Sequence, residues 1–136
     1  PLLSTLSPPN GLLMPTAIRR RLNVLVYSDV GVSTAALHHC LATLQRLLRH
    51  SHAVQTVTAM QLASAPWEDT CGLLVIPGGR DLPYCEALAG EAVMRISRYV
   101  REAGGRYLGL CAGAYFAARR VRFEAGRPGY EVIGPR

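Results

Sequence analysis

One cysteine, Cys111, stands where a chain could hold a nucleophile. It follows the apolar run 107–110 and precedes Ala112, Gly113 and Ala114. Small residues allow a tight turn, so we expect a strand–turn–helix arrangement, the nucleophile elbow that hydrolases use for serine. The N–H groups at the start of the next helix would favour thiolate over thiol. The alternative is that Cys111 is a small packed residue of the core.

A second tight turn, Pro77-Gly78-Gly79, follows the apolar run 72–76. The carboxyl ends of parallel strands open onto one edge of a sheet, where ligands bind. We therefore expect the N–H groups of Gly79 and Ala112 to form an oxyanion hole beside the Cys111 sulfur. The further residues expected to form the binding site are Asp29, Gly78, Arg80, Asp81, Gly113 and Tyr115.

Two interpretations of Asp29 and Asp81 stay open, because each follows a predicted strand. One of them could serve as a carboxylate partner of the thiol, although an ionised carboxylate nearby raises the pKa of a cysteine. We prefer the alternative, in which Asp29 shapes its turn and Asp81 caps the following segment. Arg80, beside the glycine pair, could instead hold an anion or a substrate carboxylate.

The usual base of such a nucleophile does not follow it in this sequence, since all histidines lie upstream, at His38, His39, His50 and His52. Leucines recur at Leu37, Leu41, Leu44 and Leu48, which predicts a helix with a buried stripe. We expect His38 and His39 to lie on the surface of that helix rather than in a catalytic site.

From residue 22 onward, strand and helix patterns alternate, which is typical of a parallel sheet covered by helices. We expect strands at 22–27, 53–58, 72–76 and 107–110, and a helix capped by Ser33. A single long helix over 84–103 would turn Leu88, Val93, Ile96 and Val100 inward and pair Glu91 with Arg95 on its solvent face. Residues 121–124 and 130–133 flank a glycine turn and predict a hairpin.

Composition favours one domain with a packed core. The 136 residues are 49% hydrophobic and carry a net charge of +6, with 15 arginines and no lysine. No apolar run approaches the roughly 20 residues of a membrane span. The basic residues are scattered, which disfavours nucleic acid as a partner and fits an acidic protein surface.

The cysteines Cys40, Cys71, Cys85 and Cys111 lack metal-ligand spacing, so we expect no metal and no cofactor. Unpaired cysteines without a secretory segment indicate the cytoplasm. Residues 1–21 are rich in proline and end on Arg19-Arg20-Arg21, which predicts a flexible basic leader ahead of a single domain over 22–136.

The stretches Val75-Ile-Pro-Gly-Gly-Arg-Asp-Leu-Pro-Tyr84 and Gly109-Leu-Cys-Ala-Gly-Ala-Tyr-Phe116 resemble the class I glutamine-amidotransferase-like fold. More narrowly, together with 22–27, the Pro66-Trp67 pair, 120–124 and 131–134, they resemble the amino-terminal domain of fungal-type biotin–protein ligases. The resemblance implies a three-layer, flavodoxin-like parallel sheet flanked by helices. The sequence stops before the further strands of a complete domain of that fold, so we expect a fragment or a minimal version.

The resemblance also implies roles. Cys111 takes the nucleophile position, and Gly79 and Ala112 take those of the oxyanion donors. The ligase chemistry of this family belongs to a separate module with a catalytic lysine, and the chain has no lysine. We therefore expect an accessory or regulatory domain without glutaminase activity, whose partner is a biotin ligase module or a biotin-dependent carboxylase. The alternatives are a small cysteine-dependent hydrolase or amidotransferase, and a domain that binds a small ligand in the same cleft.

Overall fold

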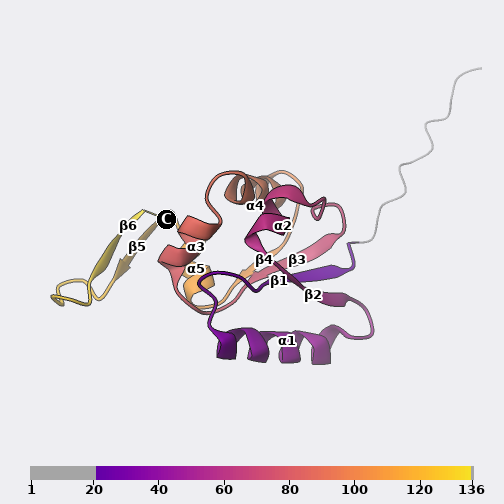
Figure 1. Cartoon of the computed structure of the whole chain (residues 1–136), viewed down its shortest axis with the longest axis horizontal. Coiled ribbons are helices and arrows are strands. Elements are labelled where there is room, and N and C mark those ends of the chain that lie inside the picture. Colours follow the sequence, from indigo (N-terminus) through magenta and orange to yellow (C-terminus); the bar gives the residue numbers. More distant parts are fainter. Residues whose placement is uncertain (1–20, 136) are drawn as a thin grey trace, which may run out of the picture.

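The computed structural model describes residues 21–135, in which a four-stranded parallel sheet lies between helices and a separate two-stranded hairpin extends to one side (Figure 1). The strands of the sheet follow the order β2-β1-β3-β4. They are β1 (Asn23–Tyr27), β2 (Ala53–Val57), β3 (Cys71–Ile76) and β4 (Tyr107–Gly109). The predicted parallel α/β sheet is confirmed, and the leader expected over residues 1–21 lies outside the described residues except for Arg21.

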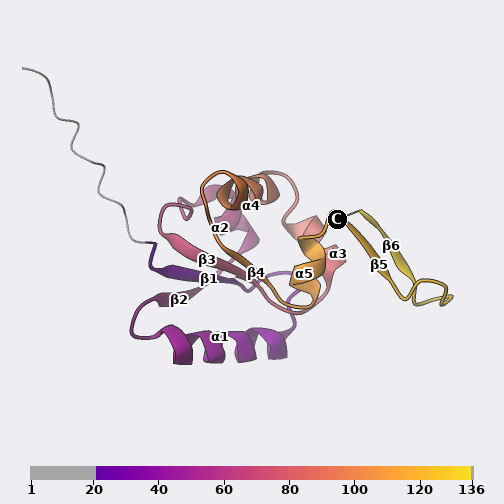
Figure 2. The ribbon, with the colours of Figure 1, turned by 180° about the vertical axis from the view of Figure 1, so that it is seen from behind.

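Alternating side chains of β1 separate two layers of helices, as the period of two along a strand requires. Val24 and Val26 are buried on the face that α1 (Thr34–Leu48) covers. Leu25 and Tyr27 are buried on the opposite face, which α2 (Ala59–Ser64) and α4 (Glu91–Arg101) cover. The two views agree that α1 lies on one side of the sheet and that α2 and α4 lie on the other (Figures 1 and 2).

Helix α1 begins where the sequence predicts. The Ser33 side chain caps the helix by accepting a hydrogen bond from the Ala36 N–H at 3.5 Å. The four predicted leucines pack against the sheet but are only half-buried, because α1 is an outer layer with solvent on its far side. His38 and His39 are exposed on its surface, as expected.

The single long helix expected over residues 84–103 is wrong. The structure has two helices there, α3 (Asp81–Ala87) and α4, and Gly90 between them adopts a φ of 75°. The break changes which side of α4 faces the core. Ala92 and Tyr99 are buried, whereas Val93 and Val100, expected to point inward, are more than one-third exposed.

Helix α2 was not predicted, although the sequence carries a signal for its start. Thr58 and Gln61 form a capping box, in which the Thr58 hydroxyl accepts from the Gln61 N–H at 3.2 Å. The Gln61 side chain in turn accepts from the Thr58 N–H at 2.9 Å. This Thr-x-x-Gln spacing is a recognised mark of a helix start. Within residues 21–135, no helix combines the length and apolar character that crossing a bilayer requires.

The last elements are α5 (Ala112–Phe116) and the antiparallel hairpin of β5 (Arg120–Phe123) and β6 (Val132–Pro135). The hairpin was predicted, but β6 begins two residues later than expected. It projects beyond the helical body beside α3 and α5 (Figures 1 and 2). Because it does not join the four-stranded sheet, the hairpin is free to form one wall of a cleft.

Candidate functional site

Cys111 occupies a strained turn between β4 and α5. Its backbone has φ 51° and ψ −110°, and it is one of the non-glycine residues in residues 21–135 with a positive φ. Such a conformation costs an L-amino acid on the order of 1–3 kcal/mol and is seen most often at functional positions. The Cys111 residue is also exposed, whereas Cys40 and Cys71 are buried.

Two glycines make this turn possible by letting α5 approach the sheet. A Cβ atom on Gly109 would lie 2.5 Å from the Gly113 carbonyl oxygen, and one on Gly113 would collide with the Ile76 carbonyl. The Tyr107 hydroxyl then donates to the Gly113 carbonyl oxygen at 2.6 Å. Gly113, predicted as a binding residue, therefore supports the turn from behind.

The glycine turn after β3 is held in place by backbone hydrogen bonds to the loop that precedes α1. The Ser33 N–H donates to the Gly78 carbonyl at 3.0 Å, and the Arg80 N–H donates to the Gly31 carbonyl at 2.9 Å. A Cβ atom on Gly78 would lie 3.7 Å from the Cys111 Cβ, which places the turn directly beside the cysteine.

Two amide groups at this junction are free to bind. In the part of the chain that the structure describes, the N–H groups of Gly79 and Ala112 donate no hydrogen bond to another group. Both residues line the same cleft as Cys111. The arrangement can therefore present backbone donors to a ligand that enters beside the sulfur.

Tyr84 forms the floor of this junction, and sequence reasoning did not identify it. Its side chain is fully buried, and its hydroxyl donates to the Pro77 carbonyl oxygen at 3.1 Å. The ring packs edge-to-face against Tyr27, with 5.5 Å between centroids. Burial, followed by the charge of Cys111, raises the pKa of Tyr84 to about 12. The only sequence feature that pointed to Tyr84 was its position at the end of the motif 75–84.

A cleft of about 370 Å³ opens beside Cys111 between α3, α5 and the hairpin. The predicted residues that line it are Gly79, Arg80, Asp81, Cys111, Ala112 and Tyr115. The lining residues that sequence reasoning missed are Leu82, Pro83, Val121, Phe123 and Val132. The missed residues are all apolar, and the last three reach the cleft because the hairpin contacts α5, where Phe123 lies 6.1 Å from Tyr115 between ring centroids.

Asp29 lies outside the lining of that cleft. Its carboxylate accepts from the Val30 N–H at 2.8 Å and from the Ala59 N–H at 3.2 Å. It thus shapes its own turn and ties that turn to the start of α2. Asp81 lies in the first turn of α3 and lines the cleft, while Arg80 stands at the N-cap position.

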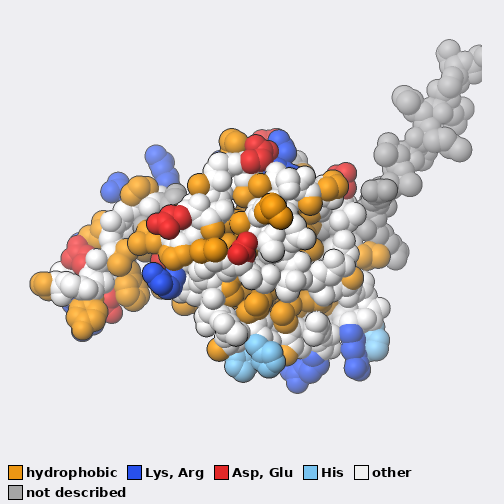
Figure 3. Space-filling model, viewed as in Figure 1, with side chains coloured by type: hydrophobic (Ala, Val, Ile, Leu, Met, Phe, Trp, Pro, Cys, Tyr) orange, Lys and Arg blue, Asp and Glu red, His pale blue; other side chains and the backbone are white. Residues whose placement is uncertain are grey.

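The histidines lie on the α1 side of the molecule. His38 and His39 belong to α1, and His50 and His52 follow its end. Their side chains appear in pale blue along that side in Figure 3, away from the hairpin. Within the described residues 21–135, no histidine lines the cleft and no group of three or more His, Cys, Asp and Glu side chains is arranged to hold a metal ion.

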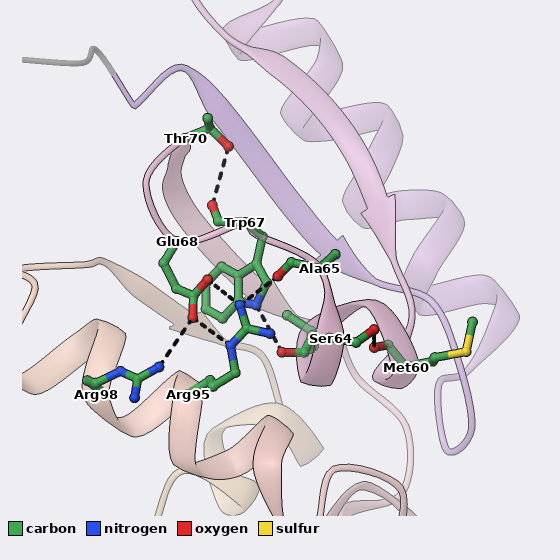
Figure 4. Close-up of polar contacts among 9 residues, drawn as sticks. Met60, Ser64, Ala65, Trp67, Glu68, Thr70, Arg95 and Arg98 are labelled. Carbon is green, nitrogen blue, oxygen red and sulfur yellow. Dashed lines mark hydrogen bonds and ion pairs between the residues drawn. The ribbon is translucent and has the colours of Figure 1, made fainter.

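A second concave region, of about 440 Å³, lies at the other end of the sheet, and its charged side chains are paired with one another (Figure 4). Arg95 donates through Nε to Glu68 Oε1 at 2.7 Å and through Nη2 to Glu68 Oε2 at 2.5 Å. The same Nη2 donates to the Ala65 carbonyl at 2.6 Å. The expected pairing of Arg95 with Glu91 on a solvent face is therefore wrong: Arg95 reaches a residue 27 positions earlier in the chain.

The carboxylate of Glu68 is held in its charged form. Burial alone would raise its pKa, but the hydrogen bonds and charge of Arg95, with a smaller contribution from Arg98, hold that pKa below its ordinary value. Trp67 lies beneath Arg95, with the guanidinium carbon 5.9 Å from the ring centroid, and its indole N–H donates to the Leu62 carbonyl at 3.0 Å.

Comparison with known proteins places this fold and cleft in a family. The family described as "Biotin-protein ligase, N terminal" matches residues 22–136. An uncharacterized protein of Chlamydia muridarum is 48% identical over 102 residues, which are 74% of this chain and 39% of that protein. The biotin–protein ligase of Schizosaccharomyces pombe is 36% identical over 115 residues, which are 85% of this chain and 18% of that enzyme.

The chain therefore spans well under half the length of these curated relatives. The matched region begins with β1 and includes both the glycine turn and Cys111. The chain belongs to the family of biotin–protein ligase N-terminal domains.

Proposed function

We propose that this chain is an accessory domain of a biotin–protein ligase system, and that a small ligand bound in the Cys111 cleft regulates a ligase module. The named relative from Schizosaccharomyces pombe is such a ligase, and the match covers only a small part of it. A regulatory role fits because the family's ligase chemistry requires a catalytic lysine, which this sequence does not contain.

The finer fold assignment belongs to the same proposal. The strand order β2-β1-β3-β4 corresponds to the first four strands of the flavodoxin-like order. In sheets of this kind, ligands bind outside the carboxyl ends of the strands. The Cys111 turn and the Pro77–Gly79 turn both lie at that edge, which supports a class I glutamine-amidotransferase-like arrangement.

The observation that carries the proposal is the cleft itself. It combines the exposed Cys111 with the unpaired N–H groups of Gly79 and Ala112, in a space of about 370 Å³. A buried structural cysteine would need neither a strained backbone nor free donors beside it. The cleft therefore has the features of a ligand site rather than of a packing defect.

The test measures biotin transfer to an acceptor protein by the ligase module, with and without this chain, whether joined or mixed. Alkylation of Cys111 with iodoacetamide fills the cleft, and the Cys111→Ser variant treated in the same way is the control. We expect the unmodified domain to change the KM for biotin or for the acceptor, and alkylation to abolish that change in the wild type alone. Identical kinetics with and without the chain would overturn the proposal.

A second candidate, a small cysteine-dependent hydrolase or amidotransferase, is favoured by the backbone strain at Cys111. In that case Cys111 is the nucleophile and the N–H groups of Gly79 and Ala112 stabilise the oxyanion. Its test is turnover of glutamine and of simple esters by the chain alone. Hydrolysis by the wild type that disappears in Cys111→Ala would replace the regulatory proposal with this one.

A further inference from the structure

We propose that the Cys111 cleft selects a small monocarboxylate with an apolar body, whose carboxylate is bound beside Arg80 and whose body contacts the hairpin. This inference rests on the proposed function, because it names the class of ligand that the same cleft would take. It follows from two features of the residues that line the cleft.

The first feature is an apolar wall that is open to solvent. Leu82 is 49% exposed, Phe123 is 45% exposed and Tyr115 is 38% exposed, and all three line the cleft. The Tyr115 and Phe123 rings lie next to each other, with 6.1 Å between centroids. Figure 3 shows apolar side chains in orange continuing from the hairpin onto the neighbouring helices.

Covering this wall with an apolar group is favourable. Removing apolar surface from water stabilises a complex in proportion to the area that is buried. The cleft volume of about 370 Å³ lies at the lower end of the range for small-molecule sites, which is about 300–1,000 Å³. The ligand body is therefore short, and a nucleotide or a peptide chain would not be enclosed.

The second feature is a cationic and donor-rich end. Arg80 is exposed and, within residues 21–135, takes part in no salt bridge. The free N–H groups of Gly79 and Ala112 line the same space. Asp81 also lines the cleft but has an interaction of its own. A planar carboxylate is the group that a guanidinium and neighbouring N–H donors bind best.

These two features favour an acid over an alkylammonium and over a strongly polar amino acid. An alkylammonium would bring a second cation to Arg80 and leave the backbone N–H groups without an acceptor. A strongly polar amino acid such as glutamine would place its own polar groups against Leu82, Tyr115 and Phe123, where no partner compensates for lost hydration. An acid with an aliphatic body suits both the apolar wall and the Arg80 guanidinium.

The experiment uses hexanoate as the probe and follows the rate at which iodoacetamide alkylates Cys111, read by intact mass. Hexylamine, hexan-1-ol and glutamine are compared at the same concentrations. We expect hexanoate to slow alkylation in a saturable way and to give a titration by calorimetry, with little or no protection by the other three. Equal protection by hexanoate and hexylamine would overturn the inference.

Matched variants identify which residues carry the selectivity. Arg80→Gln should remove the preference for hexanoate, whereas Arg122→Gln, on β5 and outside the cleft, should keep it. Phe123→Ser should weaken hexanoate binding, whereas Tyr130→Ser, in the exposed turn of the same hairpin, should not. Circular dichroism checks that each variant folds. Wild-type selectivity in Arg80→Gln would contradict the assignment.

The outcomes separate this inference from the proposed function. If the chain alters ligase kinetics but hexanoate neither protects Cys111 nor binds, then the ligand class is wrong and the regulatory role stands. If hexanoate binds selectively but ligase kinetics never change, the ligand class stands and the regulatory role fails.

Discussion

The Glu68 region and the Cys111 cleft, two of the concave regions of this domain, differ in what their polar groups do. Around Glu68 and Arg95 both charged groups are paired, and the guanidinium also reaches a backbone carbonyl. Beside Cys111, two backbone N–H groups and the Arg80 guanidinium have no such partners within residues 21–135. Both regions are open, but the charged groups of the first are paired with one another and the donors of the second are not.

The position of each region in the sheet agrees with this difference. The Glu68 region lies in the connection just before β3, at the amino end of the strand. The Cys111 cleft lies after β3 and β4, at their carboxyl ends, where ligands of open α/β sheets bind. The charged groups that pair with each other, Glu68 and Arg95, therefore indicate a structural contact. The unpaired donors beside Cys111 indicate the candidate site.

The largest expected effect tests the structural side of the comparison. Trp67 is 5% exposed and packs against Tyr99, with 4.9 Å between ring centroids. We expect Trp67→Ala to lower the free energy of unfolding by about 3–5 kcal/mol, because it leaves a cavity in the core. Urea denaturation measures this.

The matched substitution in the cleft is Phe123→Ala, which removes an aromatic ring that is already 45% exposed. Its cost should be well below that of Trp67→Ala. If the two substitutions cost the same, the cleft wall would be part of the core, and the contrast drawn between the regions would be wrong.

The second effect concerns the arginines of the two regions. Arg95→Met leaves Glu68 with only Arg98, at 3.8 Å, and should cost about 1–3 kcal/mol. Arg80→Met removes an exposed side chain without a salt bridge in residues 21–135 and should change stability by no more than about 0.5 kcal/mol. Thermal and urea unfolding of both variants provide the measurement.

The ion pair between Glu68 and Arg95 can also be tested at low pH. Because the pKa of Glu68 is lowered in the folded state, its contribution is present above the ordinary value of 4.5 and is lost as the pH falls through the folded pKa. The Arg95→Met variant should lose less stability than the wild type between neutral and acidic pH. An identical acid-side loss in both proteins would show that the ion pair contributes nothing.

Alkaline pH should affect the layer beneath both regions. Burial raises the pKa of Tyr84 to about 12, and it also raises the pKa values of Tyr27, Tyr99 and Tyr107. The contribution of these tyrosines to stability is therefore fully present below pH 10 and is lost as the pH rises toward their folded pKa values. Deprotonation of Tyr84 above pH 10 should therefore lower the free energy of unfolding.

Urea unfolding between pH 8 and pH 11 measures this loss. In Tyr84→Phe the free energy of unfolding should fall less steeply with pH, because the buried hydroxyl that ionises is gone. Tyr115→Phe is the control, since the Tyr115 side chain is 38% exposed. A decline that is equally steep in Tyr84→Phe would mean that the Tyr84 hydroxyl beneath the cleft is accessible to water.

The smallest effect concerns the strain at Cys111. Glycine adopts a positive φ without steric cost, so Cys111→Gly should stabilise the domain by roughly 0.5–1 kcal/mol. Cys111→Ala keeps the side-chain clash and should show no gain. A Cys111→Gly variant less stable than Cys111→Ala would indicate that the turn holds no strain, and would weaken the case for a functional cysteine.

Much of the fold was predictable because it depends on local patterns. Continuous apolar runs identified the strands, and the serine before residues 34–48 identified the start of α1. The break at Gly90 was missed because apolar residues continue at helical spacing on both sides of it. Helix α2 was missed because its six residues are too few to show a period, although its capping box was readable.

The candidate site was predictable in part. The neighbourhood of Cys111 and Gly79 follows from the edge of a parallel sheet, and the structure brings both into one cleft. The apolar wall could not be predicted, since Val121, Phe123 and Val132 reach it only through the path of the hairpin. Asp29 was named as a candidate site residue from its place after a strand, although the preferred interpretation was that it shapes its turn, and its carboxylate accepts from the Val30 and Ala59 N–H groups.

The central position of β1 has a consequence for the order in which the domain forms. Val24 pairs with Val54 of β2 on one side and with Leu73 of β3 on the other, so both neighbours are synthesised after β1. Helix α1 can form from local contacts while β1 still lacks both partners, and pairing across long stretches of chain is slow. During synthesis, β1 thus lacks at least one of its two strand partners until residue 76 has left the ribosome. A nascent chain of this family should therefore engage chaperones through its first strand rather than its last.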